Sequence, residues 1–334
     1  MQYCPYDLLA QRENVIFGGT PTTGTSLLVS PFDKRFNAQN DLNSSADTSV
    51  GIALHAIDRG LLDSSLLVSS DSFSVDALAG IYFLVDQGQN ISVDLLTALS
   101  RMAIYEHGDD RDVAHINFIL NSWTHPVDSP LHAEMFKQSA AYLANVLYEE
   151  LLQRLAKIVD KVDYLERYWT KEEEKLSLSE ALLHEGVITL QTNEELDLAV
   201  FKIPPSELRQ KGRLFEPYTS DNTPWHNRVH RIALHNLSSC SRILLQSATK
   251  RFFYFRADSS ILARREHLKP RGDLSPIATK LNDMEGLANL WRSTPIDEPR
   301  SALWTEESQS SGLSDEEFIE ALASFLNGMK GVKD

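Results

Sequence analysis

Residues 65–85, SLLVSSDSFSVDALAGIYFLV, contain a strand-like apolar run followed by a helical pattern. The apolar run ends at Asp71, and an amphipathic helix with Asp76 in its first turn comes next. In an open α/β sheet, ligands bind beyond the carboxyl ends of the strands, at turns of this kind. The helix macrodipole also favours an anion in the first turn. The segment therefore predicts an α/β fold and makes Asp71 and Asp76 candidate catalytic residues.

The serines of this turn admit two explanations. In the functional one, Ser72 and Ser74 bind substrate beside the two carboxylates. In the structural one, either serine caps the helix and Asp76 only complements its dipole. The spacing does not separate these explanations, so both remain open.

The chain divides by pattern into three parts. Up to about residue 123, short apolar runs such as VIFGG and SLLVSP alternate with helical patterns, which is typical of βαβ units around a mainly parallel sheet. Residues 130–185 are helical in pattern almost throughout, and after residue 186 two hairpin patterns precede further helices. We therefore predict an N-terminal α/β domain over 1–125, a helical connector over 126–185 with a long helix between about 130 and 160, and a smaller α+β domain over 186–334.

The composition is that of a globular protein. With 334 residues, 42% hydrophobic and 24% charged, the chain is long enough for about two domains. Its formal charge of −15 argues against nucleic acid or an anionic membrane as a partner. No apolar run approaches the roughly 20 residues that span a bilayer, and the N-terminus lacks the pattern of a signal peptide. We expect a cytoplasmic protein with neither partner, and the sequence does not indicate its oligomeric state.

A basic segment departs from the acidic average of the chain. Between residues 242 and 271, eight basic residues accompany two acidic ones. Guanidinium groups match carboxylate and phosphate geometry, so the segment suits a small anionic molecule, with Arg256, Arg271 and Asp273 as candidate substrate-binding residues. The alternative is that these cations pair with acidic groups of the same protein. For Asp273, the alternative is a helix cap.

Two further motifs carry candidate chemistry. The segment EHGDDRDVAH, residues 106–115, places carboxylates near an imidazole, which suits a divalent ion or acid–base catalysis and makes Asp109 a candidate. The alternative is that one of its aspartates caps a helix. In PWHNRVHRIALHN, His226 and His230 have metal-like spacing, but no glutamate lies between them. We therefore favour a single catalytic histidine, His230. With no CxxC motif and only Cys4 and Cys240, a structural zinc site is not expected.

Several segments resemble an uncharacterised bacterial family, a domain of unknown function, whose N-terminal motif is similar to that of the DHH phosphoesterases. The similarity covers about residues 7–326 and is carried by DTSVGIALHAI, SSDSFSVDALAGIYFLVD, GDD, LDLAVF, HRIALHNLSSCSRIL and PRGDLSPIATKLNDMEGLANLW. It implies two domains, with the active site in a cleft between a parallel-sheet domain and a smaller C-terminal domain.

The departures from that family bear on its metal site. Where the family reads His-Phe-Asp-x-Asp-Gly, this chain has Ser72-Phe73-Ser74-Val75-Asp76-Ala77, so only the last carboxylate is kept. Where the family reads Ser-His-Trp, this chain has Ser30-Pro31-Phe32. A hydroxyl is a poor replacement for a carboxylate or an imidazole as a metal ligand. We expect either weak Mg- or Mn-like binding through Asp76 and Asp109 or no cofactor.

Two functions from different classes follow. In the first, the chain is a small-molecule enzyme, phosphoesterase-like in fold, that acts as a hydrolase or biosynthetic enzyme on an anionic substrate in the interdomain cleft. Its catalytic residues are then Asp71, Asp76, Asp109 and His230. In the second, the metal site has decayed and the chain is a ligand- or partner-binding protein.

Overall fold

The computed structural model describes residues 1–31, 48–204, 225–256, 273–294, 301–306 and 308–331. They form two compact units, the first over Met1–Glu173 and the second from Glu174 onward. The predicted α/β class is confirmed, because a parallel sheet lies near the N-terminus and a mixed sheet lies in the C-terminal part.

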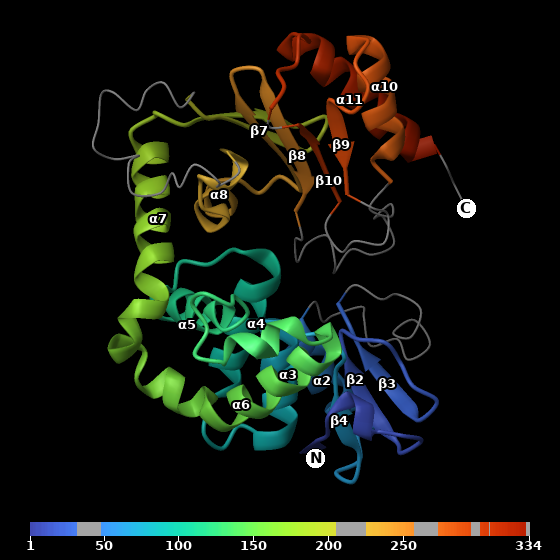
Figure 1. Cartoon of the computed structure of the whole chain (residues 1–334), viewed down its shortest axis with the longest axis vertical. Helices are drawn as coiled ribbons and strands as arrows, with labels where there is room; N and C mark the ends of the chain where they lie inside the picture. Colours follow the sequence, from blue (N-terminus) through green and yellow to red (C-terminus); the bar gives the residue numbers. More distant parts are fainter. Residues whose placement is uncertain (32–47, 205–224, 257–272, 295–300, 307, 332–334) are drawn as a thin grey trace. The chain divides into compact units, whose positions relative to one another are not determined.

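The first unit places a four-stranded sheet beside a set of helices (Figure 1). Its elements are β1 (Gln2–Tyr3), η1 (Tyr6–Leu8), β2 (Asn14–Phe17), β3 (Thr25–Val29), α2 (Ser49–Asp58), β4 (Leu67–Ser69), α3 (Val75–Asp86), α4 (Val93–Tyr105), α5 (Arg111–Ser122), η2 (Ala133–Lys137), α6 (Ala140–Asp160), η3 (Val162–Leu165) and the start of α7 (Glu166–His184). The long helix expected between about 130 and 160 is α6.

The order of strands in this sheet is β1-β4-β2-β3, and every neighbouring pair is parallel. From β2 the chain passes to β3 on one side, and it then returns through α2 to β4 on the other side of β2. The strand order therefore reverses between β2 and β4. Open α/β sheets bind ligands at the carboxyl ends of the strands that flank such a switch point.

Helix α3 packs closely on this sheet. A side-chain carbon added at Gly80 would lie 2.5 Å from Cε1 of Phe17, at the end of β2, so only glycine permits this approach. The helix begins at Ser74, whose hydroxyl accepts a hydrogen bond from Ala77 N at 3.1 Å. Its residues from Val75 to Leu84 are all buried. Helix α3 is thus a core element that starts at the carboxyl edge of the sheet.

The second unit is built on a six-stranded mixed sheet of order β5-β6-β7-β8-β10-β9. Its elements are the end of α7, β5 (Thr189–Asn193), β6 (Leu198–Lys202), η6 (Trp225–Asn227), α8 (Arg231–Leu237), β7 (Arg242–Ser247), β8 (Lys250–Phe255), α10 (Ser275–Glu285), β9 (Trp291–Ser293), β10 (Ala302–Thr305) and α11 (Asp315–Gly331). The predicted hairpins are the antiparallel pairs β5–β6 and β7–β8.

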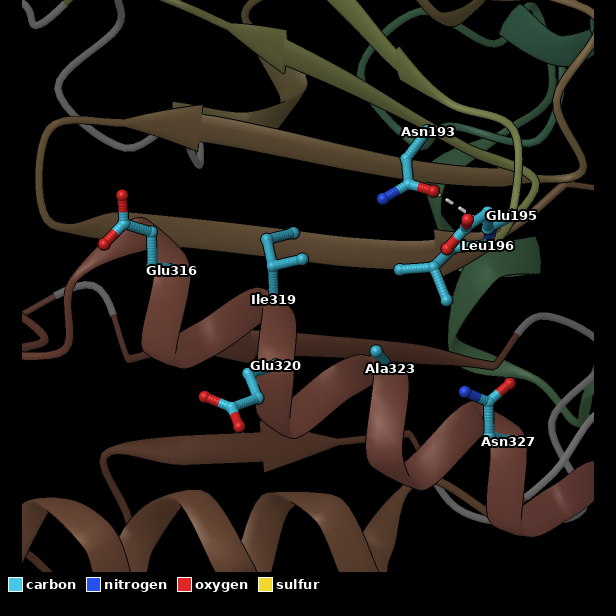
Figure 2. A pocket seen from close by; sticks show the side chains of 8 residues that line it. All are labelled: Asn193, Glu195, Leu196, Glu316, Ile319, Glu320, Ala323 and Asn327. Atoms are coloured by element: carbon cyan, nitrogen blue, oxygen red, sulfur yellow. Dashed lines mark hydrogen bonds between the residues drawn. The ribbon is translucent and has the colours of Figure 1, made fainter.

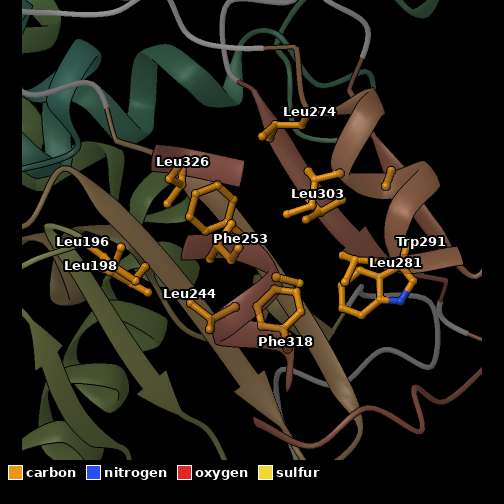
Figure 3. Close-up of a cluster of buried hydrophobic side chains, with 14 of the residues drawn as sticks. Leu196, Leu198, Leu244, Phe253, Leu274, Leu281, Trp291, Leu303, Phe318 and Leu326 are labelled. Atoms are coloured by element: carbon orange, nitrogen blue, oxygen red, sulfur yellow. The ribbon is translucent and has the colours of Figure 1, made fainter. Parts of the chain in front are cut away.

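Alternate residues of these strands enter two cores, as a period of two requires. Leu244 and Phe253 belong to the cluster that includes α10 and α11, where the rings of Trp291 and Phe318 stack at 5.1 Å (Figure 3). Their neighbours in β7 and β8 belong to the other cluster, together with residues of α7 and α8. The sheet is therefore covered on both faces, which explains its nearly continuous apolar strands.

Candidate functional site

The carboxyl ends of β2 and β4 carry two turns that contact each other. Gly18-Gly19-Thr20 follows β2, and Ser70-Asp71-Ser72 follows β4. Thr20 N donates to Asp71 Oδ1 at 3.1 Å, and Ser72 Oγ donates to the carbonyl of Gly18 at 3.4 Å. A side-chain carbon on Gly19 would lie 2.2 Å from Asp71 Oδ1, so a larger residue at this position would displace the carboxylate. These bonds join the two turns across the switch point of the sheet.

Asp71 is half-exposed at this position. The Tyr6 hydroxyl lies nearby and donates to the carbonyl of Thr20 at 2.9 Å. Desolvation, followed by the negative charge of Asp71, raises the pKa of Tyr6 above its ordinary value. Tyr6 therefore stays protonated at neutral pH and remains a hydrogen-bond donor beside the carboxylate.

Tyr148 of α6 stabilises the turn that follows β4. Its hydroxyl donates to the carbonyl of Ser72 at 2.9 Å, and Ser70 Oγ donates to the same carbonyl at 2.7 Å. Burial raises the pKa of Tyr148 well above its ordinary value, so the phenol is a permanent donor. The ring packs against Phe73 with centroids 5.2 Å apart. The turn that carries Asp71 is thus held by a helix that lies far away in the sequence.

Asp76 lies in the same strand-to-helix segment but is enclosed within the core. Its side chain is 6% exposed. Oδ1 accepts hydrogen bonds from Ser49 N at 3.0 Å and from Ser100 Oγ, and Oδ2 accepts one from Ser49 Oγ. The carboxylate therefore joins the first turn of α3 to the start of α2 and to the middle of α4. Each of its oxygens is already used by a donor of the protein.

The two serines of the motif differ in their roles. Ser74 caps α3, as the structural explanation of the sequence proposed, whereas Ser72 is exposed and bonded to the β2 turn. Of the four predicted residues in this segment, Asp71 and Ser72 lie at the carboxyl edge with exposed surface. The sequence missed Thr20, Tyr6 and Tyr148 as their partners. The Gly-Gly pair directly after the apolar run of β2 was the available indication of a tight turn there.

The segment after α4 places its aspartates in separate roles. Asp109 is exposed in the turn between α4 and α5. Asp110 caps α5, because its Oδ1 accepts from Asp112 N at 3.0 Å and from Val113 N at 3.2 Å. His115 lies 3.0 Å from Glu173 and stacks on a tryptophan ring of α7. The structure thus provides local capping at this motif and leaves Asp109 on the surface.

The predicted residues of the second unit also have structural partners. His230 caps α8, where its Nδ1 accepts from Ile232 N at 3.2 Å. The guanidinium of Arg256 is buried and donates to the carbonyl of Ser238. Asp273 accepts from Ser275 N at 2.9 Å, and the hydrogen bonds from Ser275 lower the pKa of its carboxyl group. Arg271 lies outside the described residues.

The basic segment is partly explained by internal pairing. Arg251 is 2% exposed and donates to Asp315 Oδ1 at 3.0 Å. The guanidinium of Arg242 donates to the carbonyl of Leu196. Arg251 therefore follows the alternative that the sequence left open, in which the cations pair with acidic groups of the same protein, whereas Arg242 and Arg256 donate to backbone carbonyls.

The residues present do not fit the metal site that the resemblance implies. In the described ranges, no group of three or more histidine, cysteine, aspartate or glutamate side chains is arranged to hold a metal ion. Asp76, the one carboxylate kept from the family motif, accepts hydrogen bonds at both oxygens. A metal ion would have to compete with these three donors for the carboxylate oxygens. No catalytic step is therefore derived through a metal at this position.

A pocket of about 580 Å³ in the second unit lies between the β5–β6 turn and α11 (Figure 2). Glu195 comes from the turn, and Glu316 and Glu320 come from the helix, with apolar side chains between them. None of the predicted site residues lines it. Carboxylates without cationic or histidine partners do not define a ligand, so this pocket is not assigned a function.

Because His226 is half-buried, we expect the second unit to lose stability in acid. Its ring stacks on Phe252 at 4.0 Å, and burial, followed by the charge of Arg231, lowers its pKa from 6.5 to about 4. Between these values the unfolded chain binds a proton that the folded chain does not, so stability falls as the pH drops from about 6.5 to about 4. After allowance for partial exposure, we expect a loss of about 1–2 kcal/mol in urea unfolding.

The variant His226→Phe is the control for this effect. It keeps the stack on Phe252 and removes the titrating group, so its stability should change less over the same pH range. An acid dependence equal to that of the wild type would show that other groups cause it.

Comparisons with known proteins give a family but no activity. A family model described as a family of unknown function (DUF6687) matches residues 1–331. A search of curated proteins finds no match. The solved structure of RecJ in complex with Mn2+ from Thermus thermophilus aligns with 98% of this chain and 42% of that chain, at 15% identity and a TM-score of 0.26. The present chain thus spans less than half of that protein.

Within the described ranges, no helix has the length and apolar character that crossing a membrane requires.

Proposed function

The chain belongs to DUF6687, a family of unknown function, and we propose a role for it from its own residues. In this proposal, the chain binds a small polar molecule at the switch point of its N-terminal sheet. Asp71 is the principal ligand-contacting residue in this proposal, and Ser72 and Tyr6 contribute hydroxyl groups. The proposed role is binding without a divalent metal at Asp76.

The observation that supports this proposal is the hydrogen bond from Thr20 N to Asp71 Oδ1. It links the turns after β2 and β4, the two strands between which the strand order reverses. Ligands of open α/β sheets bind at this point because the connections on its two sides diverge and leave a crevice. Asp71 is half-exposed there, while the glycine turn beside it brings backbone close to its carboxylate.

The chemistry of Asp71 indicates what the ligand carries. Oδ1 accepts from Thr20 N, and Oδ2 has no hydrogen-bond partner among the described residues. An ionised carboxylate only accepts hydrogen bonds, so it selects hydroxyl or amino donors. A polyol, an amine or the ribose of a nucleoside fits this requirement.

Asp76 favours binding over metal-dependent hydrolysis. The sequence motif keeps this one carboxylate of the phosphoesterase-like pattern, and its three donors come from serines of α2 and α4. Releasing it for a metal would leave buried donors unsatisfied, at a cost of about 1–3 kcal/mol each. The hydrogen bonds of Asp76 therefore stabilise the packing of α2, α3 and α4, and we assign it this structural role rather than that of a metal ligand.

The proposal is tested by binding of a polyol, an amine and a nucleoside to the whole chain, with myo-inositol, ethanolamine and adenosine as probes in calorimetry. We expect one of these probes to bind at millimolar concentration or below. Asp71→Asn should weaken that binding by about 10- to 150-fold, because a hydrogen bond to a charged group contributes about 1.5–3 kcal/mol. The variant keeps an oxygen that can accept from Thr20 N, so the fold should be retained.

The matched control is Asp94→Asn, which removes an exposed carboxylate in the first turn of α4. It should leave binding unchanged. Absence of binding by all three probes, or equal binding by Asp71→Asn and the wild type, would contradict the proposal. Dialysis against MnCl₂ adds a second measurement, in which stoichiometric binding would contradict a metal-free site.

An enzyme with Asp71 as its acid–base residue is the second candidate. It is favoured by the half-exposed carboxylate with an unused oxygen at the position where α/β enzymes carry catalytic groups. Conversion of a bound probe, followed by mass spectrometry and lost in Asp71→Asn but kept in Asp94→Asn, would identify the enzyme. Binding without conversion would favour the ligand-binding protein.

A further inference from the structure

The first unit contains a groove whose lining differs in charge from the acidic average of the chain. It has a volume of about 590 Å³ and is lined by the end of α5, the segment 130–132, the second half of α6 and the start of α7. Pockets for small ligands usually have volumes of about 300–1,000 Å³. None of the residues proposed to bind at the sheet edge lines this groove.

Four cations line the groove. Arg154, Lys157 and Lys161 are spaced three and four residues apart along α6 and its C-cap, so they share one face of the helix. Arg167 joins them from the first turn of α7. Glu150 is the one carboxylate among the lining residues that the structure describes, in a chain of formal charge −15.

The carboxylate neutralises only one of these cations. Glu150 Oε2 lies 2.7 Å from a guanidinium nitrogen of Arg154. The ammonium groups of Lys157 and Lys161 make no hydrogen bond or ion pair within the described part of the chain, and the guanidinium of Arg167 lies over the ring of Tyr168 at 4.3 Å. Three positive charges of the groove therefore have no carboxylate partner among the residues that the structure describes.

The helix macrodipole explains only part of this arrangement. Cations in the last turn of a helix are favoured, so Lys157 and Lys161 suit the end of α6 without any ligand. Arg167 lies in the first turn of α7, where the same dipole opposes a cation. The ring of Tyr168, over which the guanidinium lies at 4.3 Å, offsets part of this opposition, and an anion bound in the groove would offset more of it.

The floor of the groove is apolar. Ile119, Trp123 and Ile158 line it, with exposed fractions of 0%, 7% and 5%. Tyr168 adds a second aromatic ring at the rim. A ligand that fits both surfaces carries an anionic group at one end and an apolar body at the other.

We propose that this groove binds a small organic phosphate, with the phosphate among Lys157, Lys161 and Arg167 and the apolar part against Trp123 and Ile158. Lysine acts as a point charge for phosphate, and arginine offers paired N–H donors to its oxygens. The site is separate from the switch point, so the proposal goes beyond the function proposed above and does not depend on it.

The test measures binding of 1-naphthyl phosphate to the whole chain by calorimetry, with inorganic phosphate and 1-naphthol as probes of the two halves. We expect 1-naphthyl phosphate to bind at least about tenfold more tightly than either half. Its affinity should fall between low and high salt, because the contacts are with solvent-accessible cations. The double variant Lys157→Gln, Lys161→Gln should weaken binding by about tenfold or more, equivalent to about 1.4 kcal/mol.

The matched control is Lys171→Gln, Lys280→Gln, which removes the same charge from exposed lysines of α7 and α10 outside the groove. It should bind as the wild type does. Equal weakening by the two double variants would contradict the assignment to this groove. Absence of binding, or equal affinity for inorganic phosphate and 1-naphthyl phosphate, would also overturn the proposal.

Discussion

Replacement of Asp76 by alanine is expected to lower the free energy of unfolding of the first unit by about 3–5 kcal/mol. The carboxylate is buried and accepts hydrogen bonds from Ser49 N, Ser49 Oγ and Ser100 Oγ. Removing it leaves three buried donors without an acceptor, and each unsatisfied group costs about 1–3 kcal/mol before the structure relaxes. Urea unfolding followed by circular dichroism measures the change.

The comparison that makes this result specific is Asp109→Ala. Asp109 is exposed in the α4–α5 turn, so its removal should change the stability by about 0.5 kcal/mol or less. Asp76→Asn should fall between the two, because an amide can replace only part of the acceptor capacity. If Asp76→Ala were as stable as Asp109→Ala, the hydrogen bonds of Asp76 would not stabilise the core. That result would favour a ligand-binding role for this carboxylate.

The second large effect is expected at Arg251 in the second unit. Its buried guanidinium donates to Ser311 Oγ at 3.1 Å, to the carbonyl of Leu313 at 2.8 Å and to Asp315 Oδ1 at 3.0 Å. It also lies 5.1 Å from the centre of the Phe318 ring. Arg251→Met should therefore destabilise the unit by about 3 kcal/mol, because it removes three hydrogen bonds of a buried charged donor and leaves their acceptors unpaired.

The exposed pair Arg292–Glu306 provides the control for Arg251. Its N–O distance is 2.7 Å, but the arginine side chain is 55% exposed. Arg292→Met should cost about 0–1 kcal/mol, as surface ion pairs do. Urea unfolding at neutral pH measures the free energy of unfolding of both variants. Similar losses in Arg251→Met and Arg292→Met would contradict the view that burial makes the hydrogen bonds of Arg251 more important for stability.

The same network makes a prediction about pH that has a defined sign. Although partial burial raises the pKa of Asp315, hydrogen bonds from Arg251 and Lys202 lower it below the ordinary value of 3.8. A carboxyl group with a lowered folded pKa stabilises the protein above its unfolded pKa, and that contribution is lost as the pH falls through the folded value. The difference between Arg251→Met and the wild type should therefore shrink in strong acid.

Much of the local structure could be predicted from the sequence. The alternation of apolar runs and helical patterns predicts the parallel sheet before residue 125, and the hairpins after residue 186 are β5–β6 and β7–β8. These features follow from periods of two and 3.6 residues, which depend only on neighbours in the chain. The sequence left Ser72 and Ser74 as possible caps of α3, and the structure shows that Ser74 is the cap. Capping can be predicted locally because it needs only a side-chain oxygen three residues before its donor.

The local pattern of residues indicates where a strand ends and a helix begins, and so identified the turn at Asp71. What each carboxylate does depends on contacts between distant segments. Asp71 accepts a hydrogen bond from Thr20, 51 residues away, whereas Asp76 is enclosed by Ser49 and Ser100, 27 and 24 residues away. The cationic groove likewise requires α6 and α7 to bring Arg167 into the same groove as Lys157 and Lys161. Spacing along the chain specifies which face of an element a side chain occupies, whereas its partners depend on strand order and helix packing between distant segments.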